Sequence, residues 1–111
     1  MLLMMLIAQA ASAPATAPGD QDRVAAAEVF DYAGWRTCAL KETHRKARST
    51  ADHAKVADMA MSACAAKEDA YRSSLAALAQ TYKLADPADF ARRNVDQARG
   101  ALHALMIKEL Q

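Results

Sequence analysis

The chain has 111 residues, a net charge of +1 and 29 alanines. This length suits one small domain with a thin core. The near balance of 14 basic and 13 acidic residues gives no overall charge that would draw the protein to nucleic acid or to a membrane. Alanine is the strongest helix former, aromatic residues make up only 5% of the chain, and no β-branched run of strand length follows residue 20. The composition therefore predicts an all-α domain.

The first ten residues, MLLMMLIAQA, have the features of a secretory signal peptide. A short apolar run ends in Ala8-Gln9-Ala10, which fits the small-x-small pattern before a signal-peptidase cut. The run is too short to span a bilayer, which needs about 20 apolar residues. The alternative is a buried N-terminal helix. Because two prolines and a glycine follow, we expect a signal peptide over 1–10, a flexible Pro/Ala spacer over 11–20 and a helical domain over 21–111.

Three helices are predicted after residue 20. The first covers about residues 22–48. The second begins at Ser49 or Thr50, which are both favourable N-caps, and ends near residue 84. The third begins at Asp86, a favourable N-cap that is followed by a proline, and ends near the C-terminus. The sequence therefore predicts a small three-helix bundle in which the first two helices form an antiparallel hairpin.

Cys38 and Cys64 are the two cysteines of the chain, and the predicted hairpin places them opposite each other. Each lies about thirteen residues from the turn near residues 49–51, so they are level across the helix pair. Catalytic dithiols usually lie close together in sequence, as in Cys-x-x-Cys, so a redox couple is the weaker interpretation. We expect a structural disulfide, formed in an oxidising compartment. It would close a loop of about 26 residues, worth roughly 3–4 kcal/mol in the chain-entropy model.

Three polar residues fall on helix faces that otherwise point inward. Glu68 lies one turn beyond the cysteine of the second helix, Asp31 lies two turns before that of the first, and Asn94 lies on the apolar face of the third. A carboxylate buried without a partner is costly, so the three are candidates for one inward polar site. The alternative is that Asp31 and Glu68 lie at the edge of the core and pair with Tyr71, Lys67 or Arg72.

Basic residues gather around the predicted hairpin turn. We call this group the basic tip: Lys41, His44, Arg45, Lys46, Arg48 and Lys55. Such a cluster can contact anionic lipid, a cell-wall polymer or an acidic protein. The alternative is that these residues stabilise the carbonyl end of the first helix. No aromatic residues interleave with them, which argues against stacking on single-stranded nucleic acid.

Residue spacing gives little support to a metal site or to catalysis. Several metal-binding residue types lie near the turn, namely His44, His53, Met59, Met61 and Cys64, but no His-x-x-x-His or Cys-x-x-Cys spacing accompanies them. The sequence also offers no pattern that indicates a nucleophile–base pair or a phosphate-binding loop. We therefore expect no metal, no cofactor and no enzymatic activity.

The third helix carries apolar residues on two sides. Leu102 and Leu105 are predicted to face inward, whereas Ile107 and Leu110 fall on the opposite side. A homodimer would bury that second side, and fraying of the helix end is the alternative. Together these features predict a small bacterial protein, periplasmic or secreted, that binds an unknown protein or an anionic envelope component. The alternative function is periplasmic metal binding or stress protection.

Overall fold

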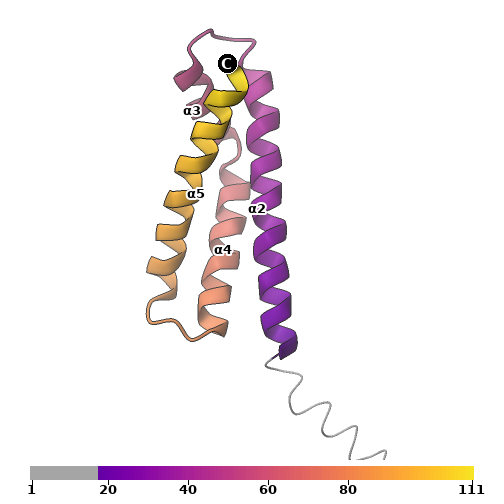
Figure 1. Cartoon of the computed structure of the whole chain (residues 1–111), viewed down its shortest axis with the longest axis vertical. Helices are drawn as coiled ribbons and strands as arrows, with labels where there is room; N and C mark the ends of the chain where they lie inside the picture. Colours follow the sequence, from indigo (N-terminus) through magenta and orange to yellow (C-terminus); the bar gives the residue numbers. More distant parts are fainter. Residues whose placement is uncertain (1–17) are drawn as a thin grey trace, which may run out of the picture.

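The computed structural model describes residues 18–111, and within this range every regular element is a helix. The elements are α2 (Pro18–Lys46), α3 (His53–Ala63), α4 (Ala65–Thr81) and α5 (Pro87–Leu110). The three long helices α2, α4 and α5 lie side by side, and α3 lies beside the ends of α2 and α5 (Figure 1). The predicted signal peptide lies outside the described residues. The helix α2 begins at Pro18, before the predicted end of the spacer at residue 20.

The prediction of a single second helix is wrong, because α3 and α4 are separate helices that meet at Cys64. Cys64 has φ −105° and ψ 20°, and its N–H donates to the carbonyl oxygen of Met61 at 3.1 Å. The described chain therefore contains four helices in place of the predicted three. No glycine or proline lies in residues 53–81, so no local sequence signal marks the break. It falls at the residue that the disulfide ties to α2.

The turn before α3 is longer than the sequence predicted. Asp52 is the N-cap of α3, and its side chain accepts a hydrogen bond from the backbone N–H of Lys55 at 3.2 Å. Ser49 and Thr50, the two predicted caps, lie in the turn. The Ser49 hydroxyl donates to the carbonyl of Lys46 at 2.7 Å and so completes the end of α2. A nearby Asp therefore replaces the predicted caps because it reaches the free N–H groups of α3.

The start of α5 agrees with the sequence. Asp86 is the N-cap, and its carboxylate accepts from the N–H of Asp89 at 3.1 Å. Pro87 occupies the first helical turn, where a missing N–H costs no helical hydrogen bond. Local chemistry alone is sufficient to begin this helix.

The core consists of two adjoining clusters. The larger one holds Trp35, Tyr71 and the apolar face of α4 and α5, and the Trp35 and Tyr71 rings are 5.7 Å apart. The smaller cluster joins α2, α3 and the end of α5 through small residues: Ala39, Ala57, Ala60 and Met106. Because α5 contributes to both clusters, it holds the α2–α3 pair and the α2–α4 pair together.

Ile107 packs within the chain, against the smaller cluster. The expectation that Ile107 lies on an unpartnered side of the third helix is therefore wrong. The reason is that α5 contacts α2, α3 and α4, so one helix needs more than one apolar side. Leu110 is partly buried.

The disulfide between Cys38 and Cys64 is confirmed, with a Cα–Cα distance of 6.0 Å. Cys64 is fully buried, whereas Cys38 is partly exposed. The bond joins the C-terminal half of α2 to the junction of α3 and α4. Among residues 18–111, none of the helices is long and apolar enough to cross a membrane.

Candidate binding surfaces

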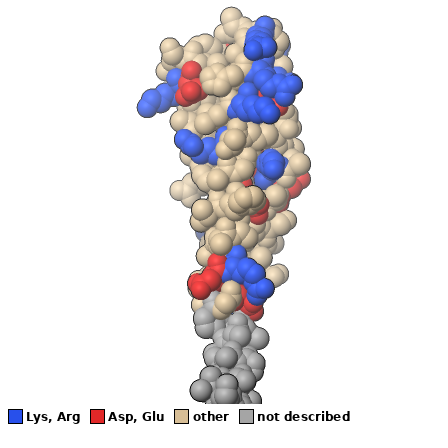
Figure 2. Space-filling view, turned by 90° about the vertical axis from the view of Figure 1, so that its right-hand side faces the viewer, with Lys and Arg blue, Asp and Glu red and all other residues tan. Residues whose placement is uncertain are grey.

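The basic tip lies at the end of the bundle where α2 ends and α3 begins. Figure 2 shows Lys and Arg side chains gathered in the upper part of the face that it views. Two members of the tip have acidic partners: Arg45 contacts Glu42 at 3.1 Å, and His44 lies 3.7 Å from Glu109. The other four make no ion pair with any described residue, namely Lys41, Lys46, Arg48 and Lys55.

The arginines of α4 and α5 behave differently. Each of them contacts at least one carboxylate: Arg72, Arg92, Arg93 and Arg99. On α5, for example, Asp89 accepts hydrogen bonds from both Arg92 and Arg93, and the bond from Arg92 contributes most to lowering the pKa of Asp89. Local pairing of this kind neutralises the arginines on these helices. Of the eight described lysines and arginines that form no ion pair, four belong to the basic tip, and the other four are Arg36, Lys67, Lys83 and Lys108.

The three inward polar candidates have three different partners. Asp31 accepts a hydrogen bond from the hydroxyl of Ser74, across the α2–α4 interface. Asn94 donates from Nδ2 to the carbonyl of Phe90 at 2.8 Å, within its own helix. Glu68 accepts from arginines on α4 and α5. The structure thus does not join these side chains in one hydrogen-bonded site, because each has hydrogen-bond partners of its own.

Glu68 connects α4 to α5. Its carboxylate accepts from Nε of Arg99 at 3.1 Å and from Arg72 at 3.1 Å. The hydrogen bond from Arg99 is the main cause that lowers the pKa of Glu68 below its usual value, against the opposing effect of burial. Sequence spacing suggested Arg72, four residues away, but not Arg99. The second partner lies 31 residues away on another helix, where only the packing of α4 on α5 brings it close.

Tyr71 and Asp31 also differ from their expected pairing. The Tyr71 hydroxyl donates to Glu28 at 3.1 Å, and Glu28 lies about one turn before Asp31 on α2. Burial and the negative charge of Glu28 raise the pKa of Tyr71 to about 12. The two helices therefore pair polar groups at both positions, but with the partners shifted by one turn.

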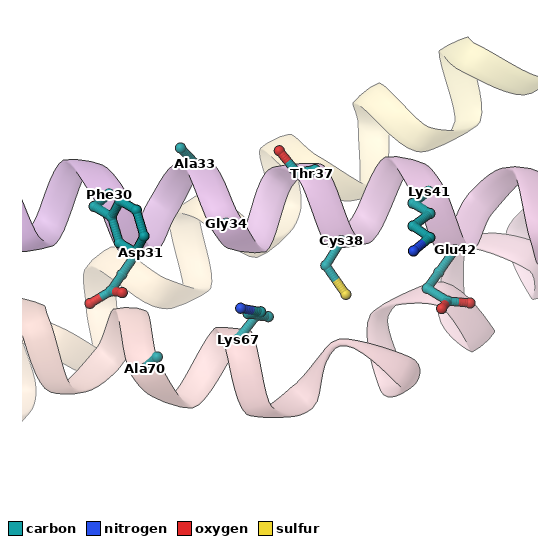
Figure 3. A pocket seen from close by; sticks show the side chains of 10 residues that line it. All are labelled: Phe30, Asp31, Ala33, Gly34, Thr37, Cys38, Lys41, Glu42, Lys67 and Ala70. Carbon is teal, nitrogen blue, oxygen red and sulfur yellow. The ribbon is translucent and has the colours of Figure 1, made fainter.

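A groove runs between α2 and α4, beside the disulfide, and encloses about 550 Å³. Small side chains form much of its lining, including Ala33, Gly34 and Ala70. Figure 3 shows Phe30 at one end, Lys41 near the other, and Lys67 on the α4 side. Sequence analysis did not find this groove. The sequence feature that could have indicated it is Phe30, an aromatic residue that lines the groove and is 76% exposed.

The residues weighed for metal binding do not form a ligand set. Among residues 18–111, no group of three or more His, Cys, Asp or Glu side chains is placed to hold a metal ion. Cys64 is part of the disulfide. His103, which the sequence did not single out, lies 3.1 Å from Asp58 and joins α5 to α3. His44 and His103 therefore each contact a carboxylate on a neighbouring helix.

Comparison of the chain with protein-family models, with curated proteins and with solved structures finds no match.

Proposed function

We propose that the protein is an exported binding protein whose basic tip attaches to an anionic component of the cell envelope. The observation that carries this proposal is the group of four tip cations without acidic partners, at one end of a bundle whose other arginines are largely paired. A charged group without a local partner retains its full attraction for an external anion. The small net charge of the whole chain hides this local excess.

The disulfide supports both parts of the proposal. A disulfide in a small domain is typical of oxidising compartments outside the cytosol, which agrees with the predicted signal peptide. It also joins the two elements that supply the tip, because Cys38 precedes Lys41 on α2 and Cys64 ends α3, which carries Lys55. The covalent bond thus keeps the cations of α2 and α3 in one arrangement.

The expected attachment is weak and reversible. Each Lys or Arg near an anionic membrane surface contributes about 1 kcal/mol. Four such residues give about 4 kcal/mol, which corresponds to a Kd of about 1 mM for one protein. A surface that displays many anionic groups raises the occupancy because it raises their local concentration. Salt should weaken this attachment, since the charges are exposed.

The test is co-sedimentation of the oxidised protein with vesicles of phosphatidylglycerol, at low and at high salt. The variant Lys46→Gln, Arg48→Gln, Lys55→Gln removes three of the four cations without acidic partners. It should lose most of the binding and keep its melting temperature, because exposed charges contribute little to stability. The matched control also removes three positive charges, but near the opposite end of the bundle: Arg23→Gln, Lys83→Gln and Arg93→Gln. The proposal is refuted if the parent protein does not bind at low salt, or if both triple variants lose binding equally.

A further inference from the structure

The break between α3 and α4 lies at the residue that the disulfide ties to α2. We propose that this disulfide is a conformational switch: the bond imposes the break at Cys64, and its reduction lets residues 53–81 close into one continuous helix. The protein then has two helical arrangements, one in an oxidising compartment and one in a reducing environment. The oxidised arrangement is the one that holds the basic tip together.

The chain around Cys64 contains no residue that favours a helix end. Sharp breaks in helices occur almost always at proline, at glycine or serine pairs, at π-bulges, or where a side chain or water enters the hydrogen-bond ladder. No proline, glycine or serine pair lies in residues 60–68, and alanine, the strongest helix former, occupies positions 63, 65 and 66. The cause of the break therefore lies in tertiary contacts, and the covalent bond to α2 acts on the residue at which the helix breaks.

The break leaves backbone hydrogen bonds unmade. The N–H of Cys64 donates to Met61, and the N–H of Lys67 donates to Cys64, in both cases three residues back. Among the described residues, the N–H groups of Ala65 and Ala66 donate to no backbone carbonyl, and no side chain caps the start of α4. A continuous helix would pair these groups with carbonyls four residues back. The backbone therefore favours the closed helix once the constraint is removed.

The break also gives α3 a direction of its own. In Figure 1, α3 does not continue the axis of α4 but lies beside the end of α5. Two contacts hold it there: Asp58 lies 3.1 Å from Nε2 of His103, and Ala57 and Ala60 share the smaller cluster with Met106. A continuous helix would carry α3 along the axis of α4, so these contacts with α5 would be lost.

The chain has the dimensions for this second arrangement. A helix over residues 53–81 would have 29 residues, as many as α2, and could pair with it along its whole length. The contact of Glu68 with Arg99 would still hold α4 against α5. Reduction therefore changes the half of the bundle that contains α3 and leaves the other half in place.

The two sulfur atoms differ in access to a reductant. Cys64 is fully buried, whereas Cys38 is partly exposed and lines the groove (Figure 3). A thiolate of a dithiol reductant therefore attacks Sγ of Cys38, forms a mixed disulfide with it and releases Cys64 as a thiolate, which takes up a proton. The second thiolate of the reductant then attacks the reductant's own sulfur in the mixed disulfide and releases Cys38, which also takes up a proton. The protein gains two electrons and two protons, and the reductant becomes a disulfide.

Amide hydrogen exchange, followed residue by residue by NMR in the oxidised and the dithiothreitol-reduced full chain, tests the switch. Loss of the disulfide should speed exchange at most amides, because it lowers stability. Ala65 and Ala66 should change in the opposite direction, with exchange at least tenfold slower, because their N–H groups gain carbonyl partners. A bond that only stabilises the observed fold would slow neither amide.

Ala66→Pro distinguishes the two arrangements by its effect on stability. Proline is tolerated in the first turn of a helix but not in its interior. It fits the start of α4 in the oxidised protein, whereas the closed helix would hold it in the interior. Ala66→Pro should lower the urea midpoint of the reduced protein by about 0.5 M or more and leave the oxidised midpoint almost unchanged. The matched control is Ala88→Pro, at the equivalent position of α5, which should act equally in both redox states.

The consequence for binding rests on the proposed function. Lys55 lies on α3, whereas Lys46 ends α2 and Arg48 lies in the turn, so closing the helix separates Lys55 from the other two. Reduced protein should bind phosphatidylglycerol vesicles about fivefold more weakly than oxidised protein, as for the loss of one lysine contact. If the oxidised protein does not bind, the proposed function fails, while hydrogen exchange still decides whether the switch exists.

Three results would overturn the switch. The first is a folded reduced chain in which the amides of Ala65 and Ala66 exchange as fast as in the oxidised protein. The second is a reduced chain that is unfolded, which would leave no second arrangement. The third is an Ala66→Pro variant whose urea midpoint shifts equally in both redox states. Equal vesicle binding by the folded oxidised and reduced forms would overturn the link between the break and the basic tip.

Discussion

The ion pair between Glu68 and Arg99 should stabilise the contact of α4 with α5, and Glu68→Gln tests this. The Glu68 side chain is 14% exposed, while its partners Arg99 and Arg72 are 43% and 40% exposed. Hydrogen bonds to charged groups contribute about 1.5–3 kcal/mol when buried, and exposed ion pairs contribute below about 1 kcal/mol. Both arginines are partly exposed, so water can solvate them once the carboxylate is removed. We therefore expect Glu68→Gln to lower the free energy of unfolding at pH 7 by an intermediate amount, about 1–2 kcal/mol.

The same ion pair predicts the pH dependence of that loss. The pKa of Glu68 is lowered in the folded protein, relative to a usual value of 4.5 in the unfolded chain. The stabilisation is therefore fully present above pH 4.5 and disappears as the pH falls through the lower, folded pKa. The difference between the parent protein and Glu68→Gln should therefore be larger at pH 7 than at pH 3.

Urea unfolding at the two pH values measures this difference directly. The matched control is Asp69→Asn, which removes a carboxylate that also contacts Arg72 but is 69% exposed. This control should change the stability by less than about 0.5 kcal/mol. The reasoning is refuted if Glu68→Gln costs no more than Asp69→Asn at pH 7, or if its cost is the same at pH 3.

Three further predictions concern the disulfide, the phenol of Tyr71 and the N-terminus. Replacing both cysteines, Cys38→Ala and Cys64→Ala, should lower the free energy of unfolding by about 3 kcal/mol in denaturant melts, and a loss below about 1 kcal/mol would contradict a stabilising role for the disulfide. The phenol of Tyr71 should ionise with a midpoint near pH 12, so the stability from its neutral form is lost only as the pH rises from about 10 towards 12; absorbance titration should show a step that Tyr71→Phe removes. N-terminal sequencing of exported protein should find Ala11 first, and an intact Met1 would contradict the predicted signal peptide.

The candidate surfaces were only partly predictable from the sequence. The basic tip is a cluster in the chain itself, so composition around residues 41–55 was enough to find it. The sequence does not show which of these cations have acidic partners. His44, for example, contacts Glu109, which lies far away in the sequence. The groove left a weaker signal, because Phe30 could equally have been a core residue. In the folded protein Trp35 and Tyr71 fill the core, whereas the side chain of Phe30 is exposed.

The sequence by itself determined the helical class, the start of α5 at Asp86 and the position of Cys38 and Cys64 opposite each other. These features follow from local rules, since propensity, capping and spacing along a helix involve residues within a few turns of each other. Tertiary structure alone decided the break at Cys64 and the pairing of Glu68 with Arg99. Both depend on how α2, α4 and α5 pack. The physical reason is that side chains from different helices meet only once the shared core fixes the positions of those helices.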